Sequence, residues 1–182
     1  MTLLNGAVSC IGTGLTNGTS YQEKFSNHTK QFMEVPKLVN EIKLTYTPRK
    51  LKRWSYINAS ATANSILRSW FPEKTINVQE TFVALFLNAQ NEVIGVHTFA
   101  TGGVSWVNVD LRLIMAVALK SLAVSIIVAH NHPSGNLQPS EADKDFTKRI
   151  KEAAGLFQIR LLDHLIVVEG GVFLSMCDAG YL

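Results

Sequence analysis

The run VSIIVA at residues 124–129 constrains the fold of this chain more than any other feature of its sequence. A short, almost continuous apolar run of this kind is typical of a β-strand that is buried on both faces. Such a strand needs other elements packed on each side of its sheet, so a single layer cannot satisfy it. The run therefore predicts an α/β domain.

The segments around this run alternate between strand and helix patterns. Residues 81–89 (TFVALFLNA) and 92–100 (EVIGVHTFA) are rich in β-formers and flank a turn at Gln90-Asn91, which predicts a hairpin. Helices are predicted at 60–71, where Pro72 ends the helix, at 110–122 and at 141–154. Further strands are predicted at 39–46 and 159–162. A closing hairpin is predicted over 165–176, with its turn at Gly170-Gly171. We expect a mixed β-sheet flanked by helices in two or three layers.

The first 40 residues differ from the rest of the chain. They are rich in Asn, Thr, Ser and Gly and show neither helical nor alternating periodicity. We expect a loosely structured, flexible N-terminal arm over 1–40 and one folded domain over 41–182, which suits a length of 182 residues. The net charge is +3, and the one dense basic stretch, at 49–53, is better explained as a solvated face or tether than as a nucleic-acid site.

Features of export and of membrane insertion are missing from the sequence. No run of about 18 apolar residues occurs, so a transmembrane helix is not expected. The N-terminus has neither the basic start nor the apolar middle of a secretory signal. Cys10 and Cys177 are too few for a disulfide framework and are expected to be reduced thiols. We expect a cytoplasmic protein without a membrane partner.

Two histidines and an aspartate follow the buried strand at a spacing that suits a metal. His130 and His132 are two residues apart, so an extended backbone points both side chains to the same side. Asp143 falls in the first turn of the next predicted helix, after a loop that turns the chain back. Two imidazoles and one carboxylate leave a fourth tetrahedral position for water, as in catalytic zinc sites. Zinc lowers the pKa of such a water from about 15.7 to about 7, which suits hydrolysis.

Each of these residues also has a simpler explanation. A pair of histidines two residues apart is by itself a weak motif. Ser140-Glu-Ala-Asp143 matches a helix capping box, and taken alone Asp143 is better explained as a cap than as a ligand. Asp163-His164, between two predicted strands, is expected to support the fold or the second shell of the site. The joint occurrence of the histidine pair and the aspartate favours the metal.

The motif HxHPSGxxxPSxxD, present here as residues 130–143, resembles the signature of the JAMM/MPN metallopeptidase class. More narrowly, the run IIVAHNHPSGNLQPSEAD and the later IRLLDHLIV resemble the RadC family, once named as DNA-repair proteins. The resemblance runs from about Glu41 to the C-terminus. It implies a JAB/MPN-type domain in which zinc is bound by His130, His132 and Asp143.

The resemblance also implies catalytic roles for two further residues. Ser140 would hydrogen-bond the water or the developing oxyanion, and a glutamate upstream of the first hairpin strand would act as general acid/base. Glu80, immediately before residues 81–89, fits that place, although without the resemblance it would be read as an exposed charge before a strand. Glu92 is the next candidate but lies beyond the turn and fits less well.

Three functions follow from these patterns. The first is a zinc-dependent hydrolase of the RadC type that cleaves a peptide or another amide-containing substrate. The second is a DNA-repair or recombination accessory in which the metal is structural or residual; longer RadC proteins carry a helix-hairpin-helix region ahead of the domain, and no such pattern occurs in residues 1–40, which weakens direct nucleic-acid binding. The third is an MPN scaffold, which the intact ligand set disfavours. The identity of the substrate and the oligomeric state do not follow from the sequence.

Overall fold

The computed structural model describes residues 55–102 and 109–182, and these form a five-stranded mixed sheet with helices. The elements in chain order are α2 (Ser60–Leu67), η1 (Arg68–Trp70), β1 (Thr81–Leu87), β2 (Val93–Thr101), α3 (Leu111–Lys120), β3 (Ser125–Asn131), α4 (Glu141–Leu156), β4 (Arg160–Val167), η2 (Glu169–Gly171) and β5 (Phe173–Ser175). The strand order is β2-β1-β3-β4-β5, with β3 and β4 parallel and the other pairs antiparallel. The predicted α/β class with a mixed sheet is confirmed.

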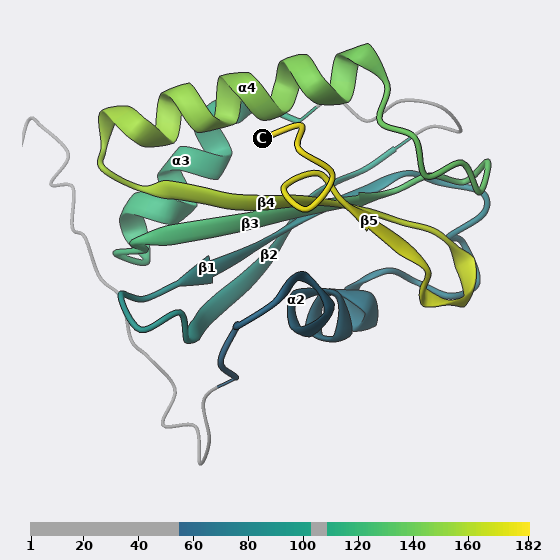
Figure 1. The fold of residues 1–182 in the computed structure, drawn as a ribbon, viewed down its shortest axis with the longest axis horizontal. Coiled ribbons are helices and arrows are strands. Elements are labelled where there is room, and N and C mark those ends of the chain that lie inside the picture. The colour runs from purple at the N-terminus through teal and green to yellow at the C-terminus, as the bar shows by residue number, and fades with distance from the viewer. Residues whose placement is uncertain (1–54, 103–108) are drawn as a thin grey trace, which may run out of the picture. The chain divides into compact units, whose positions relative to one another are not determined.

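Helices cover both faces of this sheet. α3 and α4 lie on one face and α2 on the other, so this part of the chain has three layers (Figure 1). The strand β3 is buried along its whole length. Its residues Ile126 and Val128 pack in the core beneath α3 and α4, while Ile127 and Ala129 pack in the core with α2. The apolar run therefore forms the doubly buried strand that its sequence predicts.

Local sequence signals explain where the helices begin. Asp110 caps α3 by accepting a hydrogen bond from the backbone N–H of Arg112 at 2.9 Å. Ser140 caps α4 in a reciprocal capping box with Asp143. The predicted closing hairpin is also present, because Gly170 and Gly171 supply the left-handed φ values of 76° and 79° between β4 and β5.

One prediction for the C-terminal strands is wrong. The expected separate strands at 159–162 and 165–168 form the single strand β4, and Asp163 and His164 lie inside it. A buried strand tolerates this polar pair because its groups are satisfied. The Asp163 carboxylate accepts hydrogen bonds from the Ser175 hydroxyl at 2.6 Å and from the backbone N–H of Cys177 at 3.0 Å. The parallel pairing with β3 places His164 opposite Val128, on the same face as His130.

Several sequence predictions fall outside the described residues. These are the arm at 1–40, the strand at 39–46 and the basic stretch at 49–53, so the proposed domain boundary at residue 41 stays a prediction. Among the helices that the structure describes, none has the length and apolar character needed to cross a membrane.

The packing of α4 on the sheet predicts a large effect of one core substitution. Ile150 is fully buried between α4 and the sheet. We expect Ile150→Ala to lower the free energy of unfolding by about 2–5 kcal/mol, because it leaves a cavity beneath the helix. Urea unfolding followed by circular dichroism measures this change. The exposed neighbour Lys151 is the matched control, since Lys151→Ala should change stability by about 0.5 kcal/mol or less. Equal stability of the two variants would contradict the packing.

Candidate metal centre

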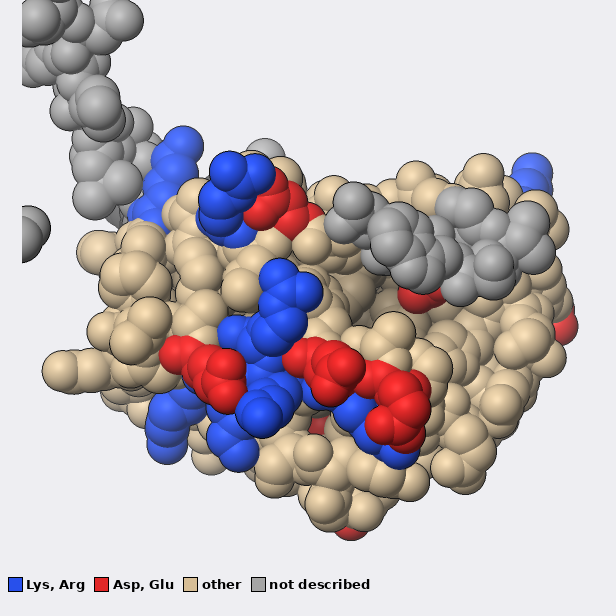
Figure 2. All heavy atoms as spheres, turned by 90° about the horizontal axis from the view of Figure 1, so that it is seen from above, with Lys and Arg blue, Asp and Glu red and all other residues tan. Residues whose placement is uncertain are grey.

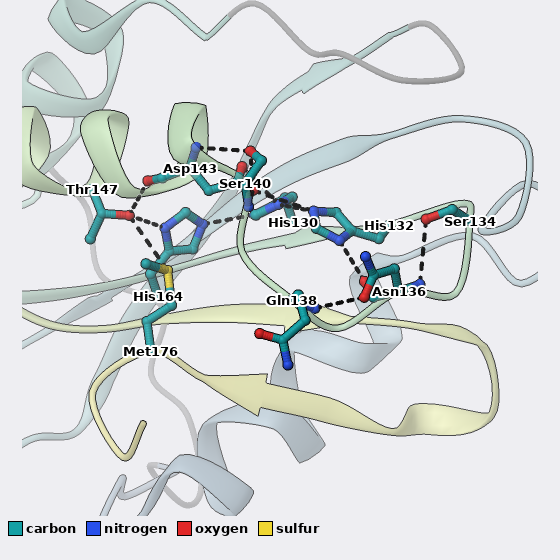
Figure 3. A network of polar contacts seen from close by, with 10 residues as sticks. All are labelled: His130, His132, Ser134, Asn136, Gln138, Ser140, Asp143, Thr147, His164 and Met176. Atoms are coloured by element: carbon teal, nitrogen blue, oxygen red, sulfur yellow. Dashed lines mark hydrogen bonds and ion pairs between the residues drawn. The ribbon is translucent and has the colours of Figure 1, made fainter. Parts of the chain in front are cut away.

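The candidate metal centre lies where β3 ends and α4 begins (Figure 3). His130 belongs to β3 and His132 follows it, and the extended backbone between them turns both rings to the same side. Asp143 reaches the pair from the first turn of α4. The ring of His130 is buried, whereas the side chains of His132 and Asp143 are each 16 % exposed. The three side chains line one open cleft.

The donor atoms of these side chains converge closely. The Nε2 atoms of His130 and His132 are 2.8 Å apart. Asp143 places Oδ1 at 3.2 Å from Nε2 of His130 and Oδ2 at 3.5 Å from Nε2 of His132. One ligand atom from each residue lies within 4.8 Å of the others, which makes this a group that can hold a metal ion.

Asp143 serves as a helix cap while facing the histidines. Its Oδ2 accepts hydrogen bonds from the Ser140 hydroxyl at 2.6 Å and from the Ser140 backbone N–H at 2.7 Å. The Ser140 hydroxyl in turn accepts a bond from the Asp143 N–H at 3.1 Å. The capping box orients the carboxylate so that Oδ1 points at His130. The two sequence explanations of Asp143 are therefore compatible.

A chain of buried hydrogen bonds assigns the proton positions on His130. The Thr147 hydroxyl lies 2.5 Å from the Asp143 backbone carbonyl and 2.6 Å from Nδ1 of His164. Because a carbonyl only accepts, Thr147 donates its single proton there and must accept from the Nδ1–H of His164. Nε2 of a neutral His164 is then an acceptor, and it lies 2.8 Å from Nδ1 of His130. His130 carries its proton on Nδ1, which leaves the Nε2 lone pair free.

The same argument applies to His132. Its Nδ1 lies 2.6 Å from the backbone carbonyl of Asn136 and must donate to it. Its Nε2 therefore also carries a lone pair in the neutral ring. Two lone pairs then face each other at 2.8 Å beside a carboxylate. These residues fit a divalent cation, because a positive charge at this point satisfies all three donors, and two His with one Asp is a donor set that zinc accepts.

The electrostatics of the two partly exposed ligands, His132 and Asp143, agree with this geometry. Burial works to raise the pKa of Asp143, but the interactions that its carboxylate makes with the two histidines when their rings are protonated, together with the hydrogen bond from Ser140, outweigh it and hold that pKa far below its ordinary value. Burial works to lower the pKa of His132, yet the hydrogen bonds to Asp143 and to the Asn136 carbonyl leave it raised. The centre thus favours a positive charge between its donors.

Glu80 lies beside this centre, immediately before β1, and lines the same cleft. Burial raises its pKa and the charge of Asp143 adds to the effect, while the two histidines lower it; the net shift is upward. A carboxylate with a raised pKa at this position can accept a proton from a group bound at the centre and return it.

The buried side chain of Asn131 holds the backbone around Glu80 in place. Its Oδ1 accepts a hydrogen bond from the Thr81 N–H at 2.7 Å, and its Nδ2 donates to the carbonyls of Ile76 at 2.6 Å and Gln79 at 2.9 Å. Asn131 stands between the two histidines in the sequence, so one β3 segment supports both the metal ligands and the glutamate.

The other sequence candidates lie as follows. Ser140 lines the cleft and is exposed, with its hydroxyl bonded to Asp143. Glu92 is not brought to the centre; it bonds the Asn88 amide at 2.8 Å beyond the opposite end of β1. Thr147 and Asn131 were missed from the sequence. Thr147 could have been found from the sequence, because it is a polar residue on the core-facing side of α4, four residues after Asp143.

The buried hydrogen-bond chain makes a prediction about pH. Burial lowers the pKa of His164 well below its ordinary value, and the neighbouring His130 adds to this. A lowered pKa means that the ring of the folded protein stays neutral as the pH falls through about 6.5, where an exposed imidazole takes up a proton. At pH 5.5 we expect His164 to be neutral with its proton on Nδ1. Long-range ¹H–¹⁵N NMR correlations report the ring state, and an imidazolium pattern for His164 at pH 6 would contradict the assignment.

Comparisons with known proteins place the chain in a family. A family model described as RadC-like JAB domain matches residues 57–181. The chain is 45% identical to a UPF0758 protein of Porphyromonas gingivalis over 104 residues, which cover 57% of this chain and 46% of the relative. It is 46% identical to a UPF0758 protein of Flavobacterium johnsoniae over 101 residues, 56% of this chain and 44% of the relative.

A third relative, a UPF0758 protein of Chromohalobacter salexigens, is 38% identical over 125 residues, 68% of this chain and 55% of the relative. The chain thus spans about half the length of the curated relatives it matches. The matched residues include the whole sheet and the metal centre. With most of its length covered by the family model, the chain belongs to the RadC-like JAB domain family.

Proposed function

We propose that this domain is a zinc-dependent hydrolase that cleaves an amide bond in a peptide or a related substrate. The observation that carries the proposal is the pair of Nε2 lone pairs that face each other beside the Asp143 carboxylate, with Glu80 in the same cleft. Membership in the RadC-like JAB domain family supports it, and the resemblance to the JAMM/MPN class implies these roles for the three donors and the glutamate.

The chemistry divides between the cofactor and the chain. A zinc ion held by His130, His132 and Asp143 would supply Lewis acidity, which polarises a carbonyl and makes water more acidic. Glu80 accepts a proton from the attacking water and returns it to the leaving amine. Ser140 lines the same cleft and donates its hydroxyl proton to Asp143 in this structure; turned toward the substrate, it would donate that hydrogen bond to the carbonyl oxygen where negative charge develops.

The alternative of a DNA-associated accessory has weaker support. Phosphate backbones are bound by several Lys and Arg side chains at once. Among the described residues that line the cleft, Arg149 alone is basic apart from the histidines. We therefore favour hydrolysis at this centre.

Metal analysis and a hydrolysis screen test the proposal together. Purified protein loaded with zinc and dialysed should retain about one equivalent, measured by plasma mass spectrometry. A library of peptides and amide conjugates, incubated with this protein, should contain substrates whose cleavage stops with a chelator and returns with zinc. Protein that retains no zinc under these conditions would overturn the proposal.

A further inference from the structure

The cleft continues beyond the metal centre along α4. It has a volume of about 770 Å³. One edge of the helix lines it, because Phe146 and Arg149 follow Asp143 at successive spacings of three residues, and Ala142 lies four residues before Phe146. The helix rises about 1.5 Å per residue, so the Cα of Arg149 lies about 9 Å further along the axis than that of Asp143. The cleft is therefore long enough for a substrate group on one side of the reacting bond.

The middle of this cleft is apolar. Phe146 packs edge to face on Phe82, with ring centroids 5.6 Å apart, and Val109 also lines the wall. Phe146 and Phe82 both contribute to the core under α3 and α4, which keeps their rings in place. A substrate portion beside the reacting bond therefore meets a rigid aromatic wall.

Arg149 lines the cleft three residues beyond Phe146 on α4. The central carbon of its guanidinium is 5.9 Å from the centroid of the Phe146 ring, a cation–π contact. Two cations on this side have acidic partners, since Lys144 pairs with Glu141 at 2.7 Å and Arg112 with Asp110 at 2.6 Å. Lys148, the neighbour of Arg149 on α4, has no such pair among the described residues, and it does not line the cleft. Basic and acidic side chains accordingly alternate over this side of the molecule (Figure 2). Within residues 55–102 and 109–182, no acidic partner of Arg149 is found.

We propose that Arg149 is an anion-binding subsite of the cleft. The substrate class is an amide whose reacting carbonyl is followed by an apolar group and then by a carboxylate or a phosphate. A guanidinium suits both anions, because its fork of N–H donors matches paired oxygens. This inference rests on the proposed function, since it takes the reacting carbonyl to lie at the metal centre.

Two matched probes test this subsite without knowledge of the natural substrate. Each is an aryl-alkyl hydroxamate, which binds zinc; one ends in a carboxylate and the other in a primary carboxamide of the same shape. On zinc-loaded protein, calorimetry should show that the carboxylate probe binds about 5- to 20-fold more tightly. Arg149→Gln should remove this preference and leave the affinity for the carboxamide probe unchanged. The preference should also shrink as the salt concentration rises.

The control variant is Lys148→Gln, which removes an exposed cation from the adjacent position of the same helix. It should keep the carboxylate preference. A phosphonate analogue of the probe distinguishes a phosphate-bearing substrate, which it would favour over the carboxylate. Equal affinity of carboxylate and carboxamide probes for the wild type would overturn the subsite alone. Failure of both hydroxamates to bind zinc-loaded wild type would contradict the proposed function and this inference with it.

Discussion

Glu80→Gln is expected to lower turnover of any amide substrate by about 10²- to 10⁴-fold while the protein keeps its metal. The amide of glutamine has the shape of the carboxylate but cannot take a proton from water. Since Glu80 does not belong to the group of metal-ligating residues, zinc content should stay near one equivalent. Initial rates on a substrate from the hydrolysis screen, measured with metal content on the same samples, give both quantities.

Glu92→Gln is the matched control for this experiment. It removes the other candidate glutamate, which lies beyond the opposite end of β1 and bonds Asn88. Its activity should be close to that of the wild type. If Glu80→Gln retained full activity, or if Glu92→Gln lost activity instead, Glu80 would not be the proton acceptor.

We expect the substitution His132→Ala to weaken zinc binding at the metal centre strongly. The variant removes one of three donors, so the affinity for zinc should fall by more than the 10- to 100-fold typical of losing a supporting residue. His132 is the histidine to change because its side chain is partly exposed and its Nδ1 bonds only a loop carbonyl. Chelator competition measures the affinity, and circular dichroism checks that the fold is retained.

His97→Ala supplies the comparison. His97 is an exposed residue of β2 that contacts Phe99 and does not line the cleft. Zinc content of this variant should equal that of the wild type. Zinc bound with unchanged affinity by His132→Ala would show that the metal, if held, uses another set of donors.

His130 is a less suitable target, and the reason shows how the centre is built. Its ring is buried, stacks near Phe82 with centroids 6.4 Å apart and bonds His164 behind it. Removing it would leave Nε2 of the buried His164 without its hydrogen-bond donor inside the core. The metal ligand is thus also part of the packing of β3 against β4, and a loss of metal could not be separated from a loss of fold.

The secondary structure around the metal centre can be predicted from the sequence. The apolar run of β3 required a doubly covered sheet, and the two-residue spacing of His130 and His132 on extended backbone fixed their common side. The pattern Ser140-x-x-Asp143 fixed the start of α4. These features depend on residues that are close in the sequence. Rules of periodicity and helix capping can therefore predict them.

Only the tertiary structure decided what surrounds the metal ligands. The sequence pattern predicted that His164 lies between two strands. In the structure it lies within β4, and the parallel pairing of β3 with β4 brings its Nε2 to 2.8 Å from Nδ1 of His130. Likewise the contact of Asn131 with Thr81 spans fifty residues and supports Glu80. The sequence could not supply these contacts, because they depend on which strands pair and in which register, and that choice is made by the burial of the whole sheet.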